Sequence, residues 1–225
     1  MRIEKVMTRK NNSYLLIAVA VALLATGCSS TKNIPENDAL YTGANINMKS
    51  SGAGAKESKV IKSDLENLTR PKPNSKIFGI RFKLGIYNLA GKGNKGLNKI
   101  LKKFGEPPVL LSQVNLENNS SILTNTLENK GFFHASVIGD TIVKNKKASA
   151  EYDVKTGVQY TLNEITFPDD SSRISRTIRS SASNSLLKTG NSFNLDVIKG
   201  ERLRIDADLK EKGYYFFNPD HLIIW

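Results

Sequence analysis

Residue types that build many catalytic and metal centres are scarce in this 225-residue chain, which has one cysteine and two histidines. A single cysteine excludes a disulfide within the chain, so the fold depends on its core alone. His134 and His221 have no third histidine that would complete a zinc site with them. The chain also lacks the Gly-x-Ser-x-Gly motif of serine hydrolases. We therefore expect no enzyme activity and no catalytic, metal-binding or cofactor-binding residues.

One glycine motif matches a nucleotide-binding pattern, but its surroundings do not. Gly91-Lys-Gly-Asn-Lys-Gly96 fits G-x-G-x-x-G, and the acidic residue Glu117 follows it. A dinucleotide-binding fold requires a parallel strand ending near that acidic residue, whereas Glu117 falls in a helical pattern. We interpret the motif as a flexible, lysine-rich loop.

The chain also lacks an apolar run of the roughly 20 residues that span a bilayer. Basic residues at the N-terminus precede a shorter apolar segment, Tyr14 to Ala25. This layout predicts a cleaved export signal over residues 1–27. The segment ends Leu24-Ala-Thr-Gly-Cys28 and resembles the lipobox of bacterial lipoproteins, although Ala25 stands where leucine is commoner.

The lipobox resemblance implies that Cys28 carries diacylglycerol and a fatty acyl group such as palmitate. Cys28 would then be the mature N-terminus, followed by a polar tether over residues 28–38, and it could not act as a nucleophile. A structural cysteine behind an ordinary signal is the alternative. Without the signal, 29 Lys/Arg and 20 Asp/Glu leave a net charge of +9. Export argues against nucleic acid as the partner, so we interpret the excess as a basic surface beside anionic phospholipid headgroups.

The most informative pattern is an internal repeat. Leu127-Glu-Asn-Lys-Gly-Phe-Phe133 returns 82 residues later as Leu209-Lys-Glu-Lys-Gly-Tyr-Tyr215. The apolar positions before each copy share a helical spacing. Ser112 and Asn194 are matched candidates for the helix N-cap. Each copy ends in a glycine, Gly131 or Gly213, where a helix terminus favours positive φ. One α+β unit is therefore used at least twice.

The sequence pattern predicts short strands and helices in the rest of the chain. Alternating or helical apolar spacing predicts a strand from Leu40 to Met48 and a helix that Pro71 terminates. It then predicts a strand over 78–86, a basic helix over 97–104 and a helix over 112–130. A strand from 132 to about 143, a turn at 144–146 and a strand over 147–155 follow; Ala148, Ala150, Tyr152 and Val154 share one face of that last strand.

The second unit begins after Gly157 with a strand carrying Tyr160, Leu162, Ile165 and Phe167. A short helix with Ile174 and Ile178 follows, with Asp169 and Asp170 near its positive end. A second helix and an aromatic strand then reach Trp225 with no third strand after them. We therefore expect the chain to be the N-terminal piece of a longer protein.

This strand–helix–helix–strand–strand order, with a glycine and two aromatic residues after the second helix, resembles the polypeptide-transport-associated (POTRA) domain. Behind a lipoprotein signal, such domains resemble the TamA-like and BamA-like outer-membrane assembly lipoproteins of Bacteroidota. Three motifs carry the same resemblance: Arg70-Pro-Lys-Pro-Asn74, Ile86-Tyr-Asn-Leu89 and Gly105-Glu-Pro-Pro-Val109.

The resemblance implies an α+β fold of tandem POTRA-like domains. The first spans 39–156 with an insertion at 71–108, and the second spans 157–225 without its last strand. Alternatively, the strand over 78–86 opens the true repeat and residues 38–70 are a separate part. A membrane β-barrel would supply the part that is missing.

The resemblance also implies a scaffold that binds unfolded outer-membrane protein clients or periplasmic partner proteins by strand addition at open sheet edges. The lipid anchor would lie in the outer membrane and the domains would face the periplasm. A free-standing envelope lipoprotein that binds partners without a barrel is the second hypothesis, and an envelope enzyme is the third. The residues expected at the client-binding edges are Phe132, Phe133, Ala135, Val137, Tyr214, Tyr215, Leu222 and Ile224.

Overall fold

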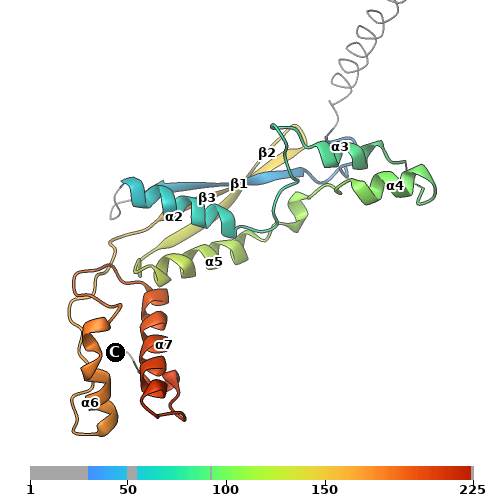
Figure 1. Ribbon diagram of the computed structural model, residues 1–225. Coiled ribbons are helices and arrows are strands. Elements are labelled where there is room, and N and C mark those ends of the chain that lie inside the picture. Colours follow the sequence, from blue (N-terminus) through green and yellow to red (C-terminus); the bar gives the residue numbers. More distant parts are fainter. Residues whose placement is uncertain (1–29, 50–54, 92, 224–225) are drawn as a thin grey trace, which may run out of the picture. The chain divides into compact units, whose positions relative to one another are not determined.

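The computed structural model describes residues 30–49, 55–91 and 93–223 (Figure 1). The predicted export signal, Cys28 and Ile224 lie outside these residues. No helix in the described part is long and apolar enough to cross a membrane. The fold is α+β, as predicted. Its elements are β1 (Leu40–Lys49), α2 (Ala55–Leu68), α3 (Phe82–Leu89), α4 (Leu97–Phe104), η1 (Leu111–Gln113), α5 (Leu116–Asn129), β2 (Ser136–Lys144), β3 (Lys147–Lys155), α6 (Arg173–Ser180), η2 (Ala182–Asn184), α7 (Leu195–Glu211) and η3 (Pro219–His221).

The described residues form two compact units, and each of the three strands has residues in both. The first unit contains α3, α4 and η1, and the second contains α2, α5 and all elements after β3. The first consists of residues 30–44, 70–91, 93–115 and 141–150, and the second of residues 45–49, 55–69, 116–140 and 151–223.

The three strands form one sheet in the order β1-β3-β2. A two-residue turn joins β2 to β3, and its residues Asn145 and Lys146 both have positive φ (51° and 58°). Positive φ at both positions is typical of a type I′ hairpin, so β2 and β3 are antiparallel. β1 runs parallel to β3, because Thr42 bonds to Ala148 and Asn47 to Asp153 at the same sequence separation of 106. The predicted strand–helix–helix–strand–strand order is thus present, with α3 and α4 between its two helices.

The two faces of β3 differ as its alternation predicts. Tyr152 and Val154 are fully buried, like Ala150 before them. On the opposite face, the side-chain amide of Asn45 donates to Glu151 at 2.7 Å, and that of Asn47 donates to Asp153 at 3.2 Å. One side of the sheet therefore meets the core and the other carries polar pairs.

Helix α5 packs on the buried face through Tyr152. The amide of Asn119 donates to the Tyr152 hydroxyl at 2.9 Å in a buried hydrogen bond. Opposite Tyr152 on β2 lies Gly139, where an added Cβ would be 2.9 Å from Tyr152 Cε1 and 3.2 Å from Ser120 Oγ. Only glycine leaves room for the tyrosine ring at this crossing of β2, β3 and α5. Helix α2 contacts α5 and adds Ile61 and Leu65 to the buried residues.

In the first unit, the predicted strand over residues 78–86 is wrong. Residues 77–80 form a turn in which Phe78 and Gly79 have positive φ, and α3 begins at Phe82. The alternation of apolar residues is misleading because only Leu84 of this segment is buried, against Ile34 and Leu40. The predicted basic helix over 97–104 is confirmed as α4.

The motifs Arg70–Asn74 and Gly105–Val109 contact each other through Asn74, which is 1% exposed. Its amide nitrogen donates to the carbonyl of Pro107 at 2.7 Å, and its oxygen accepts from the N–H of Val109 at 2.9 Å. Ser75 donates to the carboxylate of Glu106 at 2.7 Å. The side chain of Asn74 therefore joins the two ends of the segment that contains α3 and α4, and in this sense closes the segment.

The repeat is confirmed where its two helices end. Gly131 and Gly213 have φ of 89° and 93°, and the next residue, Phe132 or Tyr214, donates its N–H to the carbonyl five residues earlier. At the helix starts the copies differ. Asn194 caps α7, as predicted, by accepting from the N–H groups of Asp196 and Val197. Ser112 does not cap α5, because it lies in η1 and its hydroxyl donates to Asp38.

The strands predicted in the second copy are not found in the described residues. The segment after Gly157 has one isolated bridge, between Thr161 and Ser192. The aromatic segment after Gly213 forms turns and η3 instead of a strand. A strand needs a partner for its main-chain groups, and here they bond locally, as when Phe217 donates to the carbonyl of Tyr214. The strand predicted from Phe132 likewise begins later, at Ser136.

Candidate interaction edge

Strand β2 lies at an edge of the sheet, because among the described residues β3 is its only strand neighbour, in the order β1-β3-β2. The edge position of this strand is confirmed. The two-residue turn pairs Lys144 with Lys147, and the pairing continues to Gly139 opposite Tyr152. In an antiparallel pair, alternate residues direct their N–H and C=O groups toward the neighbour. The main-chain groups of Ile138 and Ile142 therefore point to β3, and those of Val137, Gly139 and Val143 point to the open edge.

The side chains beside this edge include exposed apolar residues. Ile138 is 66% exposed and Ile142 57% exposed, on the face opposite the buried Tyr152 ring. Isoleucines at such exposure on the polar face add nothing to the core. They could instead contact the alternate side chains of a strand added beside β2. Neither isoleucine was predicted from the sequence, and the register of β2 against β3 is the signal that identifies them.

The opposite edge of the sheet is partly covered. The N–H of Tyr41 in β1 donates to the carbonyl of Val109 at 2.8 Å, and the N–H of Leu111 donates to the carbonyl of Ala39 at 2.9 Å. The segment after the Pro107-Pro108 pair thus occupies the first part of the β1 edge. This leaves β2 as the better candidate for strand addition.

The predicted client-binding residues before β2 serve other contacts. Phe132 is fully buried, and Ala135 is half-buried in the turn that precedes the strand. The ring of Phe133 makes edge contacts with Tyr160 at 5.3 Å and with Phe193 at 4.9 Å between ring centroids. Of the four residues predicted at this edge, Val137 alone lies within β2.

Main-chain bonds hold this aromatic cluster of Phe133, Tyr160 and Phe193 together. The N–H of Tyr160 donates to the carbonyl of Gly131, and the N–H of Phe193 donates to the carbonyl of Tyr160. Within the second unit, the cluster joins the exit of the first repeat to the entry of the second.

Among the residues that the structure describes, those predicted at the edge of the second copy lie outside any strand. Tyr214 and Leu222 pack against the buried cluster of Ile178, Ile205 and Leu209. Tyr215 is 73% exposed, next to the fully exposed Phe216. These side chains lie on turns, where no strand orients the main chain for pairing.

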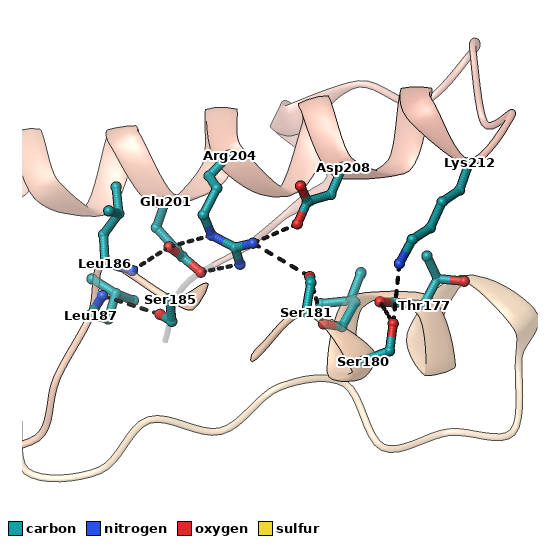
Figure 2. A network of polar contacts seen from close by, with 11 residues as sticks. Thr177, Ser180, Ser181, Ser185, Leu186, Leu187, Glu201, Arg204, Asp208 and Lys212 are labelled. Carbon is teal, nitrogen blue, oxygen red and sulfur yellow. Dashed lines mark hydrogen bonds and ion pairs between the residues drawn. The ribbon is translucent and has the colours of Figure 1, made fainter. Parts of the chain in front are cut away.

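A network of mostly part-buried polar contacts joins α6 and η2 to α7 (Figure 2). The carboxylate of Glu201, 3% exposed, accepts from Arg204 Nη2 at 2.7 Å and from the N–H of Leu186 at 2.8 Å. Arg204 also bonds to Asp208 at 2.6 Å and to the Ser181 hydroxyl at 3.4 Å. Burial raises the pKa of Glu201, but the hydrogen bonds from Arg204 and Leu186 outweigh it and hold that pKa below its usual value. The network is structural and offers no open site.

The start of α6 is fixed by a second set of polar contacts. Ser172 caps the helix by accepting from the N–H of Ser175, and the carboxylate of Asp170 accepts from the Ser175 hydroxyl at 2.6 Å. Hydrogen bonds from Ser172 and Ser175 lower the pKa of Asp170 to about 2. Asp170 therefore stays ionised at the positive end of the helix, which is the position predicted for it from the sequence.

The two histidines make ordinary contacts. His134 Nε2 lies 3.2 Å from the Tyr160 hydroxyl, and the His221 ring packs on Phe217. Over the described residues, no group of three histidine, cysteine or acidic side chains is placed to hold a metal ion.

Comparison with known proteins gives a likeness among solved structures. No family model and no curated protein matches the sequence. Among solved structures, the chain is similar to the crystal structure of Haemophilus influenzae BamA POTRA3-5, at a TM-score of 0.39 and 18% sequence identity. The alignment covers 81% of this chain and 59% of that one, so this chain spans less than two thirds of its length. A likeness of this degree does not assign the chain to that family.

Proposed function

We propose that this chain is a protein-interaction module that binds an extended client or partner by adding it as a strand to β2. The observation that carries the proposal is the edge position of β2, with main-chain groups of Val137, Gly139 and Val143 directed away from β3. Main-chain hydrogen bonds do not depend on the client's sequence, and Ile138 and Ile142 supply apolar contacts beside them.

The finer form of the proposal joins this edge to the sequence resemblance. The chain would be the N-terminal POTRA region of an outer-membrane lipoprotein, anchored through Cys28 and facing the periplasm. It would assist the assembly or translocation of outer-membrane proteins by holding them extended. The lipobox, the repeat and the three POTRA-like motifs support this form. The alternative is a free-standing envelope lipoprotein that uses the same edge without a barrel.

Proline substitution tests the edge directly. Val137→Pro/Val143→Pro removes two N–H groups that point away from β3, so the hairpin bonds of β2 remain. The control variant Val137→Ala/Val143→Ala shortens both side chains, a larger loss of side-chain contacts than in the proline variant, and keeps both N–H groups. The probe is a synthetic peptide of alternating apolar and polar residues, and its affinity is measured by fluorescence anisotropy.

We expect the proline variant to lose about tenfold or more in affinity and the alanine variant to lose much less. Far-ultraviolet circular dichroism and urea unfolding establish that both variants are folded. Equal peptide affinity of the folded proline variant and the wild type would refute strand addition at β2.

A further inference from the structure

The segment from Lys76 to Gly105, which contains α3 and α4, lies outside the interaction edge of β2 and has two properties of its own. All its charged residues are basic, and none is acidic. It also exposes a series of large apolar side chains. Those with their exposed fractions are Ile77 (53%), Phe78 (100%), Ile80 (56%), Phe82 (61%), Leu89 (74%), Leu97 (70%), Ile100 (53%) and Phe104 (67%).

The exposed apolar residues of α4 share one face. Leu97, Ile100 and Phe104 are three and four residues apart, which is the spacing of a single helical stripe. The exposed Lys99 and Lys103 alternate with them along the helix. An exposed apolar stripe beside lysines is typical of helices that lie in the surface of an anionic bilayer.

The helix pair is held in a defined shape. An added Cβ at Gly105 would lie 2.6 Å from the backbone nitrogen of Tyr87, so the end of α4 passes directly over α3. The N–H of Glu106 donates to the carbonyl of Lys83 at 3.0 Å. The stripe on α4 is therefore presented by a packed pair of helices (Figure 1).

The start of the described chain lies on the same unit. Ile34 is buried against Leu84 of α3, and the amide of Asn33 donates to Asn88 at 3.2 Å. Ile34 is the sixth residue after Cys28. Such a stretch spans at most about 20 Å when fully extended. If Cys28 carries a lipid, Ile34 lies within this distance of the bilayer surface, and Leu84 of α3 lies next to Ile34.

We propose that α3 and α4 form a membrane-docking surface that inserts the stripe of Leu97, Ile100 and Phe104 between the headgroups of an anionic bilayer. The lysines around the stripe contact the lipid phosphates. The choice of an anionic bilayer over an apolar protein partner rests on charge complementarity, because the segment is basic throughout. It rests also on the short chain between Cys28 and Ile34.

Vesicle co-sedimentation tests this surface. The chain is produced from Ser29 onward without a lipid, which keeps every residue that the structure describes. The vesicles contain phosphatidylcholine and phosphatidylglycerol in equal amounts, or phosphatidylcholine alone. The test variant is Leu97→Ser/Phe104→Ser. The matched control is Val158→Ser/Leu203→Ser, which removes side chains that are 67% and 62% exposed outside this segment.

We expect the wild type to bind the anionic vesicles, and the test variant to bind about tenfold or more weakly. The control should stay within about twofold of the wild type. Lys99→Glu/Lys103→Glu should weaken binding to anionic vesicles by about tenfold or more. Failure of the wild type to sediment with anionic vesicles, or equal binding by the test variant, overturns the proposal and leaves the stripe to a protein partner.

A second measurement is independent of how the serine variants fold. The chain from Ser29 has no cysteine, so a single Ile100→Cys can carry an environment-sensitive fluorophore, with Leu203→Cys as its counterpart. Anionic vesicles should shift the emission of the label at position 100 to shorter wavelength and leave the label at 203 unchanged. An unshifted label at 100 overturns the proposal. Both tests leave peptide binding at β2 untouched, so the two proposals fail separately.

Discussion

The substitution Gly139→Ala tests how β2, β3 and α5 pack against one another. An added Cβ would lie 2.9 Å from Tyr152 Cε1 and 3.2 Å from Ser120 Oγ, closer than side-chain carbons ordinarily approach. The Tyr152 ring is fully buried and its hydroxyl is bonded to Asn119, so it cannot move aside freely. Overpacking of this kind costs about 1–3 kcal/mol. For a chain of this size, that corresponds to a loss of roughly 2–12 °C in melting temperature.

Urea unfolding of the chain from Ser29 measures the change, with Gly85→Ala as the control. Gly85 lies in α3 with no atom within 4 Å of an added Cβ, so alanine there should stabilise the helix by about 0.5–1 kcal/mol. Removing the ring as well, in Gly139→Ala/Tyr152→Leu, should show a favourable coupling between the two positions. Wild-type stability in Gly139→Ala would contradict both the register of the hairpin and the place of α5.

Three other substitutions test single polar contacts by urea unfolding. Glu201→Gln removes the buried carboxylate that pairs with the half-buried Arg204 and should cost about 2–3 kcal/mol at pH 7. Because its folded-state pKa is lowered, Glu201 stabilises the fold above its unfolded-state pKa of about 4.5, and that contribution is lost as the pH falls through the folded value. The cost of Glu201→Gln should therefore shrink in acid, and a pH-independent cost would contradict this. Asn194→Ala removes a helix cap and should cost about 1 kcal/mol, whereas Ser112→Ala should cost less than about 0.5 kcal/mol; equal costs would count against the capping difference. Asn74→Ala leaves the Val109 N–H and the Pro107 carbonyl without this partner and should cost about 1–3 kcal/mol, and an unaffected variant would mean that Asn74 does not close the segment.

Patterns set by local geometry predicted the fold well. The alternation of Ala148, Ala150, Tyr152 and Val154 identified the buried face of β3, because the side chains of a strand point to alternate faces. Gly131 and Gly213 were recognised as helix ends, because glycine adopts positive φ at the least cost. Both inferences need only the residues of one element.

Features that depend on partners far along the chain were missed. The alternation from Phe78 to Ile86 predicted a strand, but no neighbouring strand pairs with it in the described residues and α3 forms instead. The role of Asn74 depends on Pro107 and Val109, more than thirty residues away. Ile138 and Ile142 were missed for a different reason: the face on which they lie follows from the register of β2 against the adjacent β3, and that register depends on a turn of two residues.

Amide hydrogen exchange along β2, with and without an extended peptide, tests the central proposal most directly. In the free protein, the amides of Ile138 and Ile142 should be protected by their bonds to β3, and those of Val137 and Val143 should exchange quickly. On addition of the peptide, Val137 and Val143 should become protected while Ile138 and Ile142 change little. Protection that appears elsewhere in the chain, with Val137 and Val143 still exchanging quickly, would contradict strand addition at β2.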